Sequence, residues 1–327
     1  MTLIIKNLSK RYDKNPIIND VSLEVERGEI LGIFGAVGEG KSTLLRAIAG
    51  VEMQNGGTIT FNSQDFTNTP CQERGFHFPN LTNESYWESI FKTDKPSQLA
   101  AGEGQVLALE DALQRAEGLL LLDNQFCYMD RQTREQNCDR LRQKVREKKL
   151  AVVFATNSFT EIFDICDRVA ILHKGEIIQT GTPREVYEHP NSAVVARVTG
   201  RNNLIEARRL TSNKADMPEF ITLKGEHRLF TDKINKNLLD VIDQNLTLAI
   251  RPEHISISFG ASFPEDNLLK AQITNIIFKG ETTLIKLDAN GLILIALVLR
   301  LVGLNIGEEC MVGLPPDRIL VLKGVAA

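Results

Sequence analysis

A glycine-rich loop between an apolar strand and a helix constrains this chain more than any other feature. Residues 29–34 predict a buried strand, and residues 41–49 predict a helix that ends at Gly50. The loop between them fits the spacing G-x-x-x-x-G-K-[ST]. The predicted nucleotide-binding residues of this phosphate loop are Gly35, Ala36, Val37, Gly38, Glu39, Gly40, Lys41, Ser42 and Thr43.

The expected role of the phosphate loop follows from its backbone. Glycines let N–H groups turn inward around phosphate oxygens, and the following helix directs the positive end of its dipole at them. Lys41 adds a charge for the β- and γ-phosphates, and Ser42 adds a hydroxyl for Mg²⁺. Asp123 follows the aliphatic run 119–122, where an acidic residue completes such a metal site. We therefore expect ATP, or a close relative, and Mg²⁺ to bind here.

The pattern along the chain predicts two domains, residues 1–200 and 201–327. In the first, buried strands such as 119–122 and 151–155 alternate with helices such as 105–116, which is typical of a parallel sheet covered on both faces. In the second, short strands alternate with turns, which favours a small β-barrel or sandwich. The best strand candidates there are residues 247–259, 271–278 and 292–298.

Composition indicates an ordinary globular protein. Hydrophobic residues make up 43% of the chain, and the net charge of −4 offers no general attraction to nucleic acid or anionic lipid. The basic segment 131–149 contains interspersed acidic residues and no aromatic ones, so we expect a solvated helix and no nucleic-acid partner. The apolar run 292–302 contains Arg300 and is shorter than the roughly 20 residues of a membrane helix. We expect a cytoplasmic protein without direct membrane insertion.

Several stretches, in the same order along nearly the whole chain, resemble an ATP-binding subunit of an ABC transporter. In the first domain they are the phosphate loop and residues 8–12, 119–123, 167–172 and 175–183. The second domain resembles the regulatory domain of the maltose, sulfate and iron(III) importer group, at residues 250–254 and 316–320.

This resemblance implies an α/β fold, with a P-loop NTPase domain and a reduced helical subdomain, followed by a small all-β OB-like domain. It implies that Tyr12 stacks on adenine. It also implies a homodimer, a permease or a competent ABC ATPase as further partner, and a peripheral location at the inner face of the cell membrane through that partner.

The chain departs from the pattern of the family at five places. Asn124 replaces the glutamate that activates water, Asn157 replaces the histidine that contacts the γ-phosphate, and Pro79 replaces the glutamine that links Mg²⁺ to the permease. The signature LSGGQ aligns with residues 99–103, where Ala100 replaces its serine and Glu103 its glutamine. The helical subdomain between residues 79 and 99 is short. We expect His77, beside Pro79, to be a surface or half-buried histidine without a compensating role.

These departures favour one interpretation over two others. An amide orients water but cannot accept its proton, so loss of the glutamate favours binding of Mg-ATP with weak or absent hydrolysis. The chain would then be a regulatory or assembly subunit. The alternatives are an energising importer subunit that hydrolyses ATP slowly by positioning alone, and a subunit paired with a competent ATPase.

The second domain leaves two further expectations. Arg251 and Glu253 are either a ligand site or a structural ion pair. Residues 292–298 are apolar at every position, which predicts a strand buried on both faces and a homodimer interface.

Overall fold

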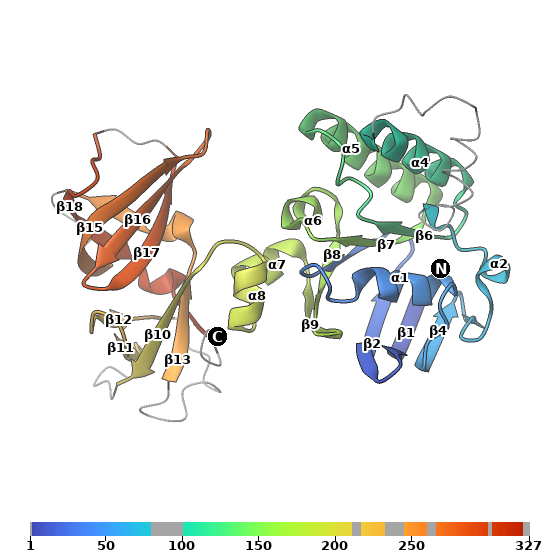
Figure 1. The fold of residues 1–327 in the computed structure, drawn as a ribbon, viewed down its shortest axis with the longest axis horizontal. Coiled ribbons are helices and arrows are strands. Elements are labelled where there is room, and N and C mark those ends of the chain that lie inside the picture. The colour runs from blue at the N-terminus through green and yellow to red at the C-terminus, as the bar shows by residue number, and fades with distance from the viewer. Residues whose placement is uncertain are drawn as a thin grey trace. The chain divides into compact units, whose positions relative to one another are not determined.

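The computed structural model describes residues 2–79, 101–210, 217–232, 245–259, 266–299 and 303–322. It forms two compact units, Met1–Glu188 and His189–Ala327 (Figure 1). The second unit begins before helix α8 (Ala193–Val198), because Ala196 packs with Ala249 and Leu322 of that unit. This division precedes the domain boundary that the sequence suggests at residue 200. No helix among the described residues is long and apolar enough to cross a membrane.

A mainly parallel sheet forms the centre of the first unit. Within the described part of the chain its strand order is β6 (Leu119–Asp123), β7 (Ala151–Thr156), β3 (Ile30–Phe34), β8 (Arg168–His173) and β9 (Glu176–Gly181), with only β9 antiparallel to its neighbour. Every residue of β3 and β7 is buried, which explains their continuous apolar sequences. The sheet places the ends of β3 and β6, and therefore the loop and Asp123, at the same edge.

Helix α1 (Lys41–Ala49) lies between this sheet and an antiparallel sheet (Figure 1). Where the chain is described, the antiparallel sheet has the order β2 (Asn15–Val25), β1 (Leu3–Tyr12), β4 (Gly56–Phe61) and β5 (Gln64–Asp65). Apolar residues of both sheets and of α1 share one core. The helix that follows the phosphate loop is therefore buried on two sides.

Helices α4 (Ala101–Arg115), α5 (Arg131–Lys148) and α6 (Phe159–Ile165) cover the other face of the parallel sheet (Figure 1). Two shorter helices are α2 (Cys71–Arg74) and α7 (Pro183–Glu188). The basic segment forms α5 as expected, beginning at Asp130, whose carboxylate accepts a hydrogen bond from the Thr133 N–H. Several of its cations are paired with acidic residues: Arg131 with Glu135, Arg140 with Glu110 and Lys144 with Glu147.

In the described part of the second unit, two antiparallel sheets surround one core. Among the described residues, one sheet has the order β12 (Arg228–Phe230), β11 (Glu219–Thr222), β10 (Asn203–Arg209), β13 (Asn245–Ile250) and β19 (Leu320–Leu322). The other has the order β14 (Ser256–Ser258), β18 (Glu309–Leu314), β15 (Asn267–Phe278), β16 (Thr283–Ala289) and β17 (Leu292–Val298).

Two strand expectations for this unit need correction. Residues 247–259 do not form one strand, because Pro252 starts a 3₁₀ turn (Pro252–His254) between β13 and β14. Strand β17 is buried on one face only: Leu294 is fully buried, whereas Ile293 is 55% exposed. Burial on both faces, which the apolar sequence predicts, is not achieved within the described part of a single chain.

Arg251 has a structural role. Its side chain is buried, and its guanidinium donates hydrogen bonds to the carbonyls of Ala196 and Arg201 and to Thr199 Oγ1, the last at 3.0 Å. These acceptors lie at the end of α8 and just after it, where a helix leaves carbonyls without partners in the helix. Glu253 is exposed. Arg251 therefore ties α8 to β13.

Candidate functional site

The phosphate loop joins β3 to α1 and lies against the ends of two other strands. A Cβ atom at Gly35 would come within 2.5 Å of the Leu172 carbonyl oxygen at the end of β8. At Gly40, the N-cap of α1, it would come within 2.9 Å of the Ile17 carbonyl oxygen in β2. Gly38 and Gly40 also have φ angles of 90° and 97°. Only glycine satisfies both the approach and the angle at Gly40.

The Gly40→Ala variant is expected to destabilise the first unit and to weaken nucleotide binding. The φ angle is strained for alanine, at a cost of about 1–3 kcal/mol, and the added methyl group also meets Ile17. Gly38→Ala is the matched control, because its φ angle is similar but nothing lies within 4 Å of the added Cβ. Urea unfolding of both variants measures the difference. Equal losses would mean that the contact with Ile17 is unimportant.

Lys41 lies in the loop with its side chain turned toward the loop backbone. It is only 6% exposed, and its Nζ donates to the carbonyls of Gly35 at 2.7 Å and Ala36 at 2.8 Å. Burial lowers the pKa of Lys41, whereas the nearby carboxylates of Asp123 and Glu39 act in the opposite direction. Lys41 and Asp123 are 82 positions apart in sequence, and the fold brings them near enough for the Asp123 carboxylate to stabilise the charge of Lys41.

The residues at this edge fit a phosphate and a divalent cation. The glycines at Gly35 and Gly40 let the loop backbone lie directly against β8 and β2, where Cβ atoms would meet backbone carbonyls. Ser42 is half-buried at the second position of α1, and Asp123 is half-buried at the end of β6. Hydroxyl and carboxylate oxygens are the ligands that Mg²⁺ prefers, so Ser42 and Asp123 are the residues that offer it a site.

The structure gives Tyr12 partners that sequence reasoning missed. Its hydroxyl donates a hydrogen bond to Glu52, which also pairs with Arg46 at 3.3 Å. The Lys10 Nζ lies 5.3 Å from the centroid of the Tyr12 ring. Burial raises the pKa of Tyr12 and the hydrogen bond to Glu52 adds to the rise, while Thr43 of the loop acts on the same hydroxyl. Tyr12 therefore lies beside the loop with its ring oriented, and it remains 43% exposed.

Asn124 follows β6 and turns its amide toward Asp123. Its backbone is left-handed, with a φ of 48°, and its N–H donates to the Ala155 carbonyl at 2.8 Å. Its Nδ2 donates to Asp123 Oδ1 at 3.0 Å, and its carbonyl accepts from Gln105 Nε2 in α4 at 3.3 Å. Gln105 is a second residue that sequence reasoning missed. The position after Asp123 thus carries an oriented amide and no carboxylate.

Asn157 is exposed directly after β7, on a loop shaped by a buried acid. Thr156 Oγ1 donates to Glu161 Oε2 at 2.5 Å and accepts from the Ser158 N–H at 3.0 Å. Glu161 is buried, and burial raises its pKa, although the hydrogen bond from Thr156 and the charge of Arg134 oppose the rise. Sequence reasoning missed Glu161, because a single glutamate in a short helix gives no sign of burial.

The Glu161→Gln variant is expected to be more stable than the wild type by about 1 kcal/mol at pH 8. The folded-state pKa of Glu161 is raised, so its contribution to stability is complete at low pH and is lost as pH rises through that pKa. The advantage of the amide should therefore shrink as pH falls toward 4. Thermal unfolding from pH 4 to 8 tests this, and an advantage that is constant with pH would contradict it.

His77 pairs with β6 at the edge of the parallel sheet. The His77 N–H donates to the Leu119 carbonyl at 2.9 Å, and the Leu121 N–H donates to the His77 carbonyl at 2.8 Å. His77 is half-buried, as expected, and burial lowers its pKa. Pro79 is buried. The short helical subdomain that the sequence predicts between residues 79 and 99 lies in a segment, residues 80–100, outside the described residues.

Part of the altered signature is described. Leu99 and Ala100 lie outside the described residues, whereas Gly102 is the second residue of α4 and lies close to the loop after Asn124. A Cβ at Gly102 would come within 2.7 Å of the Tyr128 carbonyl oxygen. Glu103 is exposed. The signature helix is therefore in contact with the segment that follows β6.

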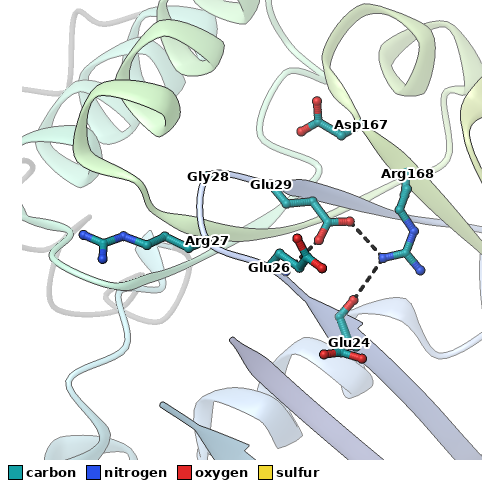
Figure 2. A pocket seen from close by; sticks show the side chains of 7 residues that line it. All are labelled: Glu24, Glu26, Arg27, Gly28, Glu29, Asp167 and Arg168. Atoms are coloured by element: carbon teal, nitrogen blue, oxygen red, sulfur yellow. Dashed lines mark hydrogen bonds and ion pairs between the residues drawn. The ribbon is translucent and has the colours of Figure 1, made fainter. Parts of the chain in front are cut away.

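A separate hollow of about 690 Å³ lies at the opposite end of the parallel sheet, where β3 and β8 begin (Figure 2). Arg168 pairs with Glu29 at 3.0 Å, and the Ile30 N–H donates to Asp167 Oδ2 at 2.8 Å. The hollow is lined by Glu24, Glu26, Arg27, Gly28, Glu29, Asp167 and Arg168. Because the phosphate loop follows the other end of β3, this hollow contributes nothing to the candidate site.

Comparison with known proteins gives matches in both units. The ABC transporter family model matches residues 18–89, and the TOBE domain model matches residues 248–322. The spermidine/putrescine import ATP-binding protein PotA of Haemophilus influenzae is 30% identical, over 88% of this chain and 86% of its own length. The Fe(3+) ions import ATP-binding protein FbpC of the same species is 31% identical, over 88% of this chain and 90% of its own length.

A solved structure of a bacterial Atm1-family ABC exporter with ATP bound has a TM-score of 0.50 and is 18% identical, covering 60% of this chain and 41% of that chain. That likeness concerns the fold alone. Together these similarities confirm the expected fold class, an α/β P-loop ATPase fold followed by a β-rich OB-like domain.

Proposed function

This chain belongs to the ABC transporter family of ATP-binding subunits, and we propose that it binds Mg-ATP but hydrolyses it weakly or not at all. The observation that carries this proposal is the amide of Asn124, which stands after Asp123 and donates to its carboxylate at 3.0 Å. An amide has no basic lone pair for the proton of an attacking water. The chain can hold the nucleotide at this edge but lacks the base that the family places there.

The residues for binding are complete. The backbone N–H groups of residues 35–43 and the Lys41 ammonium bind phosphate, and Ser42 and Asp123 hold Mg²⁺. The Tyr12 ring, whose hydroxyl donates to Glu52, would stack on adenine. When bound, Mg²⁺ would neutralise charge on the phosphates. Binding and hydrolysis therefore depend on different residues of this chain, and the altered ones serve hydrolysis.

The proposed role is that of a regulatory or assembly subunit in a complex with a membrane permease or a competent ABC ATPase. The bound nucleotide would order the phosphate loop and so select the shape that a partner meets. We place the chain in the cytoplasm, at the inner face of the membrane through that partner. Its relatives carry names with different cargoes, spermidine/putrescine and Fe(3+), at nearly equal identity. We therefore assign no cargo to this chain.

A second candidate is an energising importer subunit that hydrolyses ATP. It is favoured by the relatives, which are import ATP-binding proteins along almost their full length. Phosphoryl transfer depends mainly on positioning and charge, so an oriented amide at residue 124 could support slow turnover. The two candidates differ in one measurable quantity, the rate of phosphate release.

The deciding experiment measures nucleotide binding by calorimetry and phosphate release by the purified wild-type chain. We expect Mg-ATP binding with phosphate release close to background. Robust release that disappears in Lys41→Ala would establish the energising subunit instead. Binding of neither ATP nor ADP would contradict both candidates.

We also propose a homodimer through the second unit. Strand β17 ends its sheet, and its outer face includes Ile293, which is 55% exposed. At one end of the same sheet, where Phe278 pairs with Thr283 and Thr283 with Val298, two further apolar side chains are exposed, Phe278 and Leu299. Ile293, opposite Asp288, lies at the other end of β17, so exposed apolar side chains occur at both ends of this strand. Exposed apolar surface of this kind is typical of an interaction surface.

The Ile293→Glu variant is expected to weaken self-association by about tenfold or more, because it places a charge in a desolvated apolar contact. Light scattering across a concentration series measures the change in mass. Lys270→Ala is the control, since Lys270 is exposed on β15 and paired with Glu309 at 2.7 Å. A wild type that stays monomeric at high concentration would refute the dimer.

A further inference from the structure

We propose that Glu39 is a positioning residue that fastens the phosphate loop to the turn between β8 and β9 and thereby strengthens nucleotide binding. The inference rests on the proposed function, because it assumes that the loop binds nucleotide. It concerns an acidic side chain at a place where negative charge would repel the ligand.

Both carboxylate oxygens of Glu39 have partners in this turn. Oε1 lies 3.0 Å from His173 Nδ1, and Oε2 accepts a hydrogen bond from the Lys174 N–H. The Glu39 side chain is only 16% exposed, so these contacts are made largely out of water. The carboxylate is therefore held by the turn.

The turn itself is firmly attached to β2. Lys174 and Gly175 have φ angles of 50° and 79°, and a Cβ at Gly175 would come within 2.4 Å of the Ile17 carbonyl oxygen. The Asn19 N–H donates to the Gly175 carbonyl at 2.8 Å, and Asn19 Nδ2 donates to Glu176 Oε1 at 2.6 Å. A loop fastened to this turn is fastened to the body of the unit.

The middle of the phosphate loop has little other support. Val37 is 85% exposed, and nothing would lie within 4 Å of a Cβ at Gly38. Before them, Gly35 rests on the Leu172 carbonyl, one residue before His173. Glu39 thus attaches the second half of the loop to the end of β8, and Gly35 packs the first half of the loop against the same end of β8.

Two effects of Glu39 on affinity have opposite signs. Its charge repels phosphates, which weakens binding. Its hydrogen bonds hold the loop in one conformation before the ligand arrives, which reduces the entropy lost on binding. Removing the charge while keeping the hydrogen bonds separates the two effects. Glutamine does this, because its amide oxygen can accept from Lys174 N and its amide nitrogen can donate to His173.

The experiment compares Glu39→Gln with Glu39→Ala, which have the same charge. Loss of both hydrogen bonds predicts a Kd for Mg-ATP about tenfold or more higher in Glu39→Ala than in Glu39→Gln. Isothermal calorimetry on the full chain gives both constants. Thermal unfolding without nucleotide checks that each variant is folded at the measuring temperature.

A cycle with His173→Ala tests whether the effect passes through the turn. We expect His173→Ala to weaken binding about threefold alone, and to change nothing when Glu39 is already alanine. Equal affinities of Glu39→Gln and Glu39→Ala, beside a wild type that binds, would overturn the positioning role and leave the proposed function intact. A wild type that binds no nucleotide would overturn both.

Discussion

Lys41→Ala is expected to abolish measurable nucleotide binding, with a Kd for Mg-ATP raised about 100-fold or more. The Lys41 ammonium is the buried cation of the phosphate loop, and hydrogen bonds to charged groups contribute about 1.5–3 kcal/mol each. The same ammonium holds the carbonyls of Gly35 and Ala36 at 2.7 and 2.8 Å, so its loss also loosens the loop. Calorimetry with Mg-ATP and Mg-ADP measures the effect.

The control is Lys144→Ala, which removes an equal charge from α5. Lys144 pairs with Glu147 on the helix surface at 2.7 Å, and exposed pairs of this kind contribute little. The affinity of the Lys144→Ala variant for Mg-ATP should equal that of the wild type. If Lys41→Ala binds Mg-ATP within about threefold of the wild type, the loop is not the nucleotide site that its spacing predicts.

Asn124→Glu is expected to raise phosphate release by about 100-fold, the lower end of what a general base contributes. A carboxylate here would stand next to Asp123 and could accept the proton of an attacking water. The remaining alterations at Asn157, Pro79 and residues 99–103 limit the gain. The φ of 48° also makes glutamate about 1 kcal/mol less favourable than asparagine, which visits the left-handed region readily.

Asn124→Gln is the matched control for this gain. It has the length of glutamate and the same backbone strain, but no basic oxygen. The rate of phosphate release should therefore be about 100-fold higher in Asn124→Glu than in Asn124→Gln. The urea midpoints of unfolding of the two variants should agree. Equal rates would show that the missing carboxylate is not what limits hydrolysis.

Residues close together in sequence were predictable. The phosphate loop, its strand and its helix occupy one continuous segment, and α1 runs over the predicted residues Lys41–Ala49. The strands β6, β7 and β17 also follow from their apolar runs. The strand expected at residues 247–259 was too long, because a turn begins at Pro252. The alternation of apolar and polar residues does not by itself show where the chain turns.

Contacts between distant residues were not predictable. Tyr12 and Glu52 are 40 positions apart, and Glu39 and His173 are 134 apart, so no spacing rule connects them. The burial of Glu161 and the single covered face of β17 depend on which elements pack beside them. One chain without an alignment carries no signal for such pairs.

The sequence by itself determined the kind of site, because phosphate binding needs a short run of glycines, a lysine and a hydroxyl in fixed order. It also determined which family residues are exchanged, since each exchange is a change of side-chain chemistry. Only the tertiary structure decided where those side chains are directed: the Asn124 amide toward Asp123 and the Glu39 carboxylate toward His173. Direction depends on the packing of strands and turns that are distant in sequence, which is why the sequence alone could not show it.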